Sequence, residues 1–194
     1  MTSSLGETWR STFNDVLQRR EDAAALKEAS MHGPLRQWTQ LLTGSVVETC
    51  ENLGWSASAI GHKLQLLPVA KSEYLGLDVT AFADGEKRWR FPKAVFELEN
   101  VLKDDRIAYS LWKVLCVRAD LRVVFCYRKT SSEASALVQL LSDEVVGAMG
   151  VQGRIDLQGE ILVVVGSREE SAYFPYGFFK WWQLEPNTGK FRVM

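Results

Sequence analysis

The chain has 194 residues, of which 46% are hydrophobic and 24% are charged, and its formal net charge is −1. This length can bury a sizeable core, and the composition is that of an ordinary globular protein rather than of a disordered or fibrous one. The near-zero net charge excludes a global field that would draw the chain to nucleic acid or to an acidic membrane. Any such partner must therefore be met by a local patch.

The cysteine and histidine content bears on the cellular compartment and on the kinds of metal site that the chain could form. The three cysteines, Cys50, Cys116 and Cys126, lack paired spacing, which predicts reduced thiols in structural positions. We expect no secretory signal and no membrane span, because the first residues lack a basic start and no apolar run approaches about 20 residues. The sequence therefore predicts a cytoplasmic protein without a membrane partner. His32 and His62 lack cysteines or acids at metal-ligand spacing, so no zinc site is indicated.

The N-terminal third of the chain reads as two helices. Apolar residues recur at helical spacing over 7–29, and the break at 31–34 contains Gly33 and Pro34. A second helix is predicted over 35–53, where Gly54 stands at the position expected for a helix stop.

The rest of the chain alternates strands and helices. Three strands are predicted first, and Asp84-Gly85 is a hairpin signal between the second and the third. Asp104 and Asp105 favour the start of the next helix, because acids stabilise that end of the helix dipole. This order predicts an α/β sandwich with a mixed sheet. The predicted strands are 59–67, 74–82, 94–100, 121–127, 160–166, 178–184 and 191–194, and a further helix is predicted over 131–149.

Carboxylates on two consecutive predicted strands are the most informative feature. Glu97 and Glu99 are two residues apart, so they share one face of the strand. Asp78 lies between apolar residues of the preceding strand, where burial without a partner is costly. Adjacent carboxylates repel unless a proton or a cation lies between them, so this set suggests an oxygen-rich site for a hard divalent cation. The plainer alternative is an exposed strand face whose acids pair with lysines.

The element order and these acids together resemble the PD-(D/E)XK nuclease superfamily, which has the restriction-endonuclease-like fold. That family has an acid on the second strand and a Glu-X-Lys on the third, and here Asp78 and Glu97 match the two acids. The likeness covers roughly residues 35–128. It implies an α/β/α sandwich of restriction-endonuclease-like type over 34–194, with an N-terminal helical extension over 1–33 and a C-terminal hairpin.

The resemblance also implies a reaction and assigns roles to residues. It implies hydrolysis of DNA with Mg²⁺ or Mn²⁺, in which Asp78, Glu97 and Glu99 bind the metal and Glu99 serves as ligand or general base. Glu99 replaces the family's usual lysine, and in some members the lysine has moved to the following helix. Lys113 is then the preferred catalytic candidate over Lys103. Glu48 is a possible additional acid, ahead of Glu51, because some members take an acid from the preceding helix.

Basic residues in the predicted hairpin suggest where nucleic acid binds. The hairpin carries Lys87, Arg88, Arg90 and Lys93 around Trp89, and we expect this patch to lie next to the acids and contact DNA phosphates. A solvated hairpin without a ligand is the plainer interpretation.

Two functions follow from this sequence. The first is a magnesium-dependent endonuclease in defence or repair, which the resemblance would also allow to be a homodimer, because such nucleases often cut both strands as pairs. The alternative is a catalytically inactive relative that keeps the fold as a binding or assembly module, which the missing lysine and the near-neutral charge favour.

Overall fold

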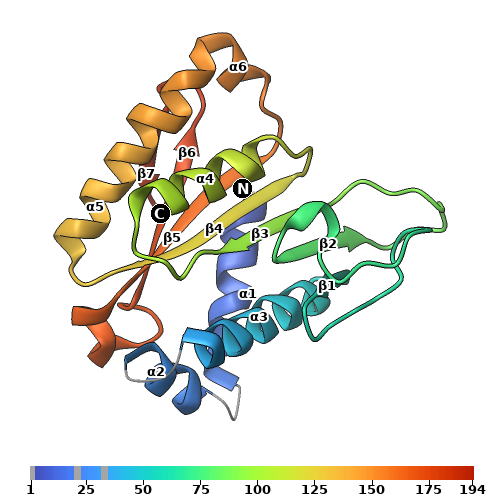
Figure 1. Ribbon diagram of the computed structural model, residues 1–194, viewed down its shortest axis with the longest axis horizontal. Helices are drawn as coiled ribbons and strands as arrows, with labels where there is room; N and C mark the ends of the chain where they lie inside the picture. Colours follow the sequence, from blue (N-terminus) through green and yellow to red (C-terminus); the bar gives the residue numbers. More distant parts are fainter. Residues whose placement is uncertain (1–2, 20–22, 32–34) are drawn as a thin grey trace.

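The computed structural model describes residues 3–19, 23–31 and 35–194. Over these residues the chain is an α/β protein in which N-terminal helices precede a seven-stranded mixed sheet flanked by helices (Figure 1). The strands lie in sequence order from β1 to β7. The three central strands, β3 to β5, are parallel, whereas each outer strand pairs antiparallel with its neighbour. The strands are β1 (Trp55–Ala59), β2 (Val79–Ala83), β3 (Ala94–Leu98), β4 (Leu121–Arg128), β5 (Glu160–Ser167), β6 (Phe179–Glu185) and β7 (Lys190–Val193).

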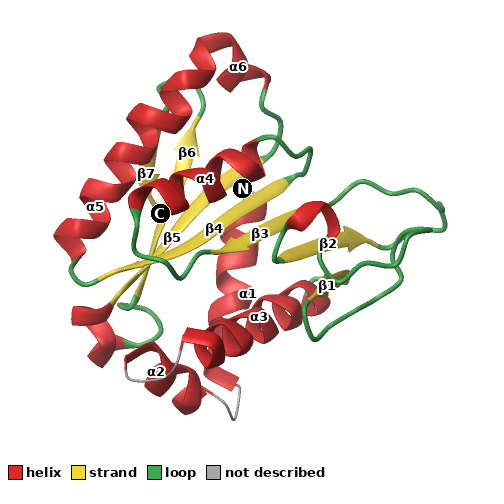
Figure 2. Cartoon of the chain, viewed as in Figure 1, coloured by secondary structure: helices red, strands yellow, loops and turns green. Residues whose placement is uncertain are grey.

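Helices cover both faces of this sheet. On one face lie α1 (Leu5–Arg19), α2 (Ala23–Met31) and α3 (Leu35–Asn52), whose apolar side chains share a core with β1 to β6. On the other face, α4 (Asp104–Leu115) and α5 (Ser131–Leu140) pack on the central strands, as Figure 2 shows. The central strands are therefore buried on both faces, as the near-continuous apolar sequences of β4 and β5 require.

Aromatic rings fix α1 against the sheet. Trp9 stacks on Phe13 with 5.1 Å between ring centroids, and both rings contact Phe125 of β4 and Trp181 of β6. The helix start is held by Glu160, whose carboxylate accepts hydrogen bonds from the first backbone N–H groups of α1. This carboxylate satisfies donors that have no partner within the helix.

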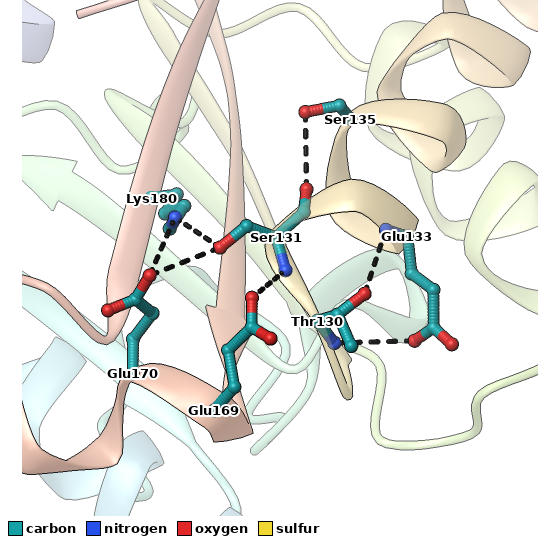
Figure 3. A network of polar contacts seen from close by, with 7 residues as sticks. All are labelled: Thr130, Ser131, Glu133, Ser135, Glu169, Glu170 and Lys180. Atoms are coloured by element: carbon teal, nitrogen blue, oxygen red, sulfur yellow. Dashed lines mark hydrogen bonds and ion pairs between the residues drawn. The ribbon is translucent and has the colours of Figure 1, made fainter.

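The start of α5 is tied to the segment between β5 and β6 by a polar network (Figure 3). Thr130 and Glu133 form a reciprocal capping box, in which each side chain accepts a hydrogen bond from the other residue's backbone. Glu169 accepts a hydrogen bond from the backbone N–H of Ser131, and Lys180 contacts the Ser131 hydroxyl and the Glu170 carboxylate. These contacts order one end of the sheet.

The helical run that begins with α5 is longer than the sequence predicted. It continues through a π turn (Leu141–Val146) and a 3₁₀ turn (Gly147–Met149) into α6 (Gly150–Asp156). By length and composition, Ser131–Asp156 could cross a membrane, contrary to the expectation that no run was long enough. Ala134, Leu137 and Leu141 pack into the core on the sheet, which explains part of this hydropathy.

Three further predictions about the elements need correction. The helix predicted over 7–29 is two helices, α1 and α2, and residues 20–22 between them lie outside the described residues. The first strand is β1 at Trp55–Ala59, not 59–67. The strand predicted over 74–82 begins only at Val79, because Tyr74–Gly76 forms a 3₁₀ turn. The predicted break at 32–34, and with it the domain boundary between 33 and 34, also lies outside the described residues.

Candidate functional site

Two acids meet where β2 begins and β3 ends. These strands are antiparallel, and Val79 pairs with Phe96, so Asp78 and Glu97 are the next opposed residues. Asp78 accepts a hydrogen bond of 2.6 Å from the backbone N–H of Leu98 to its Oδ2 atom. The pairing confirms that these two side chains share one face of the sheet, which is the face covered by α4.

Glu97 is buried beside a lysine from α4. It is only 4% exposed, and its Oε1 atom lies 2.8 Å from Nζ of Lys113. The distance makes an ion pair, but the angles do not make a hydrogen bond, so the buried Oε1 has no hydrogen-bond donor. The lysine donates its hydrogen bond to the carbonyl of Gly76, at 2.8 Å. Lys113 therefore links α4 to β3 and to the 3₁₀ turn that precedes β2.

Burial dominates the electrostatics of the site. It raises the pKa of Glu97 to about 7, against the opposing effect of Lys113 and with a further contribution from the charge of Asp78. The pKa of Asp78 is also raised, chiefly by burial, although the Leu98 N–H and Lys113 oppose the shift and Glu99 adds to it. Two neighbouring carboxyl groups whose pKa values burial raises mark a candidate functional site.

The structure adds Glu73, which the sequence analysis missed. Burial raises the pKa of Glu73. The charge of Asp78 raises this pKa further, and the charge of Lys113 lowers it. The residue precedes the 3₁₀ turn in which Leu75 has a positive φ of 60°. No strand or helix periodicity relates Glu73 to Asp78, so the sequence pattern gave no signal for it.

Glu99 lies beyond the end of β3 and is held by other groups. Its Oε1 accepts a hydrogen bond of 2.8 Å from the backbone N–H of Val101, and its Oε2 is 3.6 Å from Nε of Arg106 on α4. Its backbone N–H donates to the carbonyl of Phe125, which extends the β3–β4 pairing. These contacts fix the start of the connection from β3 to α4.

The acids only partly match the predicted three-carboxylate shell. Within residues 3–19, 23–31 and 35–194, no three histidine, cysteine or acidic side chains form a group that could hold a metal ion. The pair Asp78 and Glu97 nevertheless supplies carboxylate oxygens, the donors that a hard cation prefers, and a cation at Glu97 Oε1 would take the place that the Lys113 ammonium now holds. Glu97 and Asp78, rather than all three acids, are the candidate ligands.

A cavity of about 470 Å³ opens beside Asp78. Its walls come from the N-terminal half of α3, from the residues after β1, and from the segment before β2. Glu48, the additional acid proposed from the sequence, is not among its lining residues, because it lies farther along α3. The lining residues are Arg36, Thr39, Gln40, Thr43, Ile60, Gly61, Glu73 and Asp78.

The basic hairpin does not lie next to the acids, contrary to the prediction. It connects the end of β2 to the start of β3, whereas the acids lie at the start of β2 and the end of β3 (Figure 1). Lys93 is four residues from Glu97 along an extended chain, about 13 Å at 3.3 Å per residue.

Two of the hairpin's cations also have structural partners. Arg90 donates to the carbonyls of Ala83 and Leu66, and Lys93 pairs with Asp120 at 2.8 Å. Lys87 and Arg88 are exposed. They are the hairpin residues best placed to meet a phosphate.

No protein-family model matches the chain, and neither a curated protein nor a solved structure does.

Proposed function

We propose that this chain is a divalent-metal-dependent nuclease of restriction-endonuclease-like architecture that hydrolyses phosphodiester bonds in DNA. The observation that carries the proposal is the contact between Glu97 and Lys113 beside Asp78. Two acids on neighbouring strands and a lysine from the following helix are what the PD-(D/E)XK resemblance requires when its lysine has moved.

The strand and helix order supports the same architecture. A helix, α3, precedes an antiparallel meander of β1, β2 and β3, and α4 then leads to β4, which is parallel to β3. This is the order of the restriction-endonuclease-like core, and β6 with β7 supplies the C-terminal hairpin.

Each residue of the site receives a role. Asp78 and Glu97 hold the cation, Mg²⁺ or Mn²⁺, through carboxylate oxygens. A bound divalent cation supplies Lewis-acid activation of the phosphate and lowers the pKa of a water ligand. Lys113 places its positive charge where negative charge develops on the phosphate. Glu99 is a positioning residue, since Val101 and Arg106 engage its carboxylate.

A cleavage assay tests the proposal. Purified protein is incubated with supercoiled plasmid and with single-stranded DNA in the presence of Mg²⁺ or Mn²⁺, and wild type is compared with Glu97→Gln and Asp78→Asn. We expect cleavage by wild type and its loss in both variants. If wild type and Glu97→Gln release the same trace of product on every DNA and RNA substrate, the nuclease assignment is wrong.

An inactive binding module is the second candidate, and one observation favours it. Lys113 already neutralises Glu97, and Glu99 is committed to Arg106, so the acids have partners without a metal. Calorimetry with Mn²⁺ separates the two candidates. A nuclease site gives binding that Glu97→Gln abolishes, whereas a site that has lost its function gives no carboxylate-dependent heat.

A further inference from the structure

The cavity beside Asp78 has a wall built from one face of α3. Arg36, Thr39, Gln40 and Thr43 are spaced by three, one and three residues, which places them on one side of a helix. This wall offers an amide, two hydroxyls and one guanidinium. Gln40 and Arg36 are exposed, and Thr39 also contacts the side-chain amide of Asn100, which follows β3.

The opposite side of the cavity is partly apolar. Ile60, which follows β1, lines the cavity although 67% of its surface is exposed. The cavity thus combines one aliphatic side chain with hydrogen-bonding side chains and with the carboxyl groups of Glu73 and Asp78, a lining that suits a flat ring with polar edges. The volume of about 470 Å³ lies within the range of roughly 300–1,000 Å³ that small-molecule sites occupy.

We propose that this cavity binds one unpaired nucleobase of the substrate, from a nucleotide beside the phosphate that is cut. The exposed amide of Gln40 bonds the edge of the base, Ile60 packs on its face, and Arg36 meets the adjoining phosphate. This inference rests on the proposed function, because Asp78 is both a wall of the cavity and a candidate metal ligand. A base in the cavity is therefore held next to the reacting phosphate.

The geometry implies a substrate class. A paired base must leave the stack to enter a pocket, which costs a few kcal/mol in duplex DNA and least where the strand is already single. The preferred substrate is therefore a single strand, or a duplex with an unpaired base at the cut. None of these contacts distinguishes ribose from deoxyribose, so DNA and RNA are tested separately.

Binding without divalent metal tests the cavity independently of cleavage. A fluorescent oligonucleotide is titrated as single-stranded DNA, as single-stranded RNA and as duplex DNA. We expect wild type to bind one or both single strands about tenfold or more tighter than the duplex. Gln40→Ala and Ile60→Ala should each weaken single-strand binding several-fold. The control is Gln37→Ala, which removes the same side chain from an exposed position of α3 outside the cavity and should change nothing.

An abasic scan locates the bound base. In wild type, binding should weaken when the base at one particular position of the oligonucleotide is removed. In Gln40→Ala, removal of that same base should no longer weaken binding. Equal affinity for single strand and duplex, equal behaviour of Gln40→Ala and Gln37→Ala, or absence of binding would each overturn the pocket. If these binding results hold and no substrate is cut with Mg²⁺ or Mn²⁺, the pocket stands and the nuclease assignment fails.

Discussion

Lys113 on α4 and Glu97 on β3 form an ion pair of 2.8 Å, in which Glu97 is buried and Lys113 is partly exposed. Two residues further along the chain, just past the end of β3, Glu99 pairs with Arg106 from the same helix, at 3.6 Å. Two acids at the end of β3 thus face two cations that are seven residues apart on α4, which is about two helical turns. In the PD-(D/E)XK resemblance, Glu99 stands where that family has a lysine, and in the proposed function a cation of α4 takes the place of that lysine.

Replacing Lys113 with a residue of similar size tests the role of its positive charge. Lys113→Met keeps most of the side-chain volume, and we expect it to slow DNA cleavage by about 10²–10³-fold, the usual loss when a group that stabilises the transition state is removed. The variant leaves Glu97 buried without a cation, so its unfolding free energy at pH 8 should fall by roughly 1–3 kcal/mol. Cleavage rates and thermal unfolding measure the two effects.

The matched control for this variant lies on β7. Lys190 also forms an ion pair on one side of the sheet, 2.5 Å from Asp143, but far along the strand order from β3. Lys190→Met should leave cleavage unchanged. If Lys113→Met cleaves DNA at the wild-type rate, Lys113 has no role in the mechanism.

The raised pKa of Glu97 predicts an unusual dependence of stability on pH. The ordinary pKa of 4.5 applies to the unfolded chain and about 7 to the folded protein. The folded state therefore holds this proton more tightly, so stability is greatest below pH 4.5 and falls as the pH rises through 7. At 1.36 kcal/mol for each pKa unit, the contribution of Glu97 to this loss is about 3 kcal/mol.

Glu97→Gln should remove this loss. In metal-free buffer the variant should be more stable than wild type at pH 8, while the difference shrinks towards pH 4. Lys113 loses its partner in the variant but keeps 25% of its side chain exposed, and so remains hydrated. Denaturant unfolding of both proteins at several pH values gives the comparison, and parallel pH curves would show that Glu97 titrates normally.

Glu99 is expected to behave as a positioning residue rather than as a metal ligand. Glu99→Gln weakens the contact with Arg106 but can still accept the Val101 N–H, so we expect it to lower Mn²⁺ affinity by less than about tenfold. Asp78→Asn and Glu97→Gln should abolish binding in the same calorimetric titration. If Glu99→Gln loses Mn²⁺ binding as completely as Glu97→Gln does, Glu99 is a third metal ligand, as the sequence predicted.

The strands that the sequence predicts well are those with a strong residue signal. The apolar runs that form β4 and β5 were predicted to within one residue of each boundary, because buried parallel strands are continuously hydrophobic. The first strand was misplaced, because Trp55–Ala59 consists mainly of alanine and serine, which give no strand signal. Its pairing with β2 and its packing under α3 come from tertiary structure, which a local pattern does not contain.

The candidate site divides in the same way. The two-residue period of strands predicts that Glu97 and Glu99 share a face, whereas the register that places Asp78 opposite Glu97 comes from the structure. Glu99 departs from that rule because β3 ends at Leu98, where the chain turns towards α4. Glu73 lies at the site because it directly precedes a 3₁₀ turn in which Leu75 has a positive φ. No residue pattern in this sequence predicts that conformation.

The position of the hairpin leads to a last prediction, on salt dependence. Lys87 and Arg88 are exposed at the end of β2 and β3 opposite to the acids, so they can contact phosphates without touching the metal site. For single-stranded DNA, loss of two phosphate contacts should reduce the slope of log affinity against log salt by about 1.4. The double variant Lys87→Ala/Arg88→Ala should show this change and keep the Mn²⁺ affinity of wild type.

The control changes the net charge equally at the far edge of the sheet. Lys190→Ala/Arg192→Ala removes two cations from β7, where they pair with Asp143 and Glu185. If both double variants reduce the salt slope alike, the hairpin acts only through net charge and is not a contact surface. A reduced slope in the hairpin variant alone means that the substrate extends from the acids along β2 and β3 to the hairpin. At about 13 Å or more from Glu97, that contact lies about two nucleotides or more from the cut on an extended single strand, and about four base steps or more on a duplex that rises 3.4 Å per step.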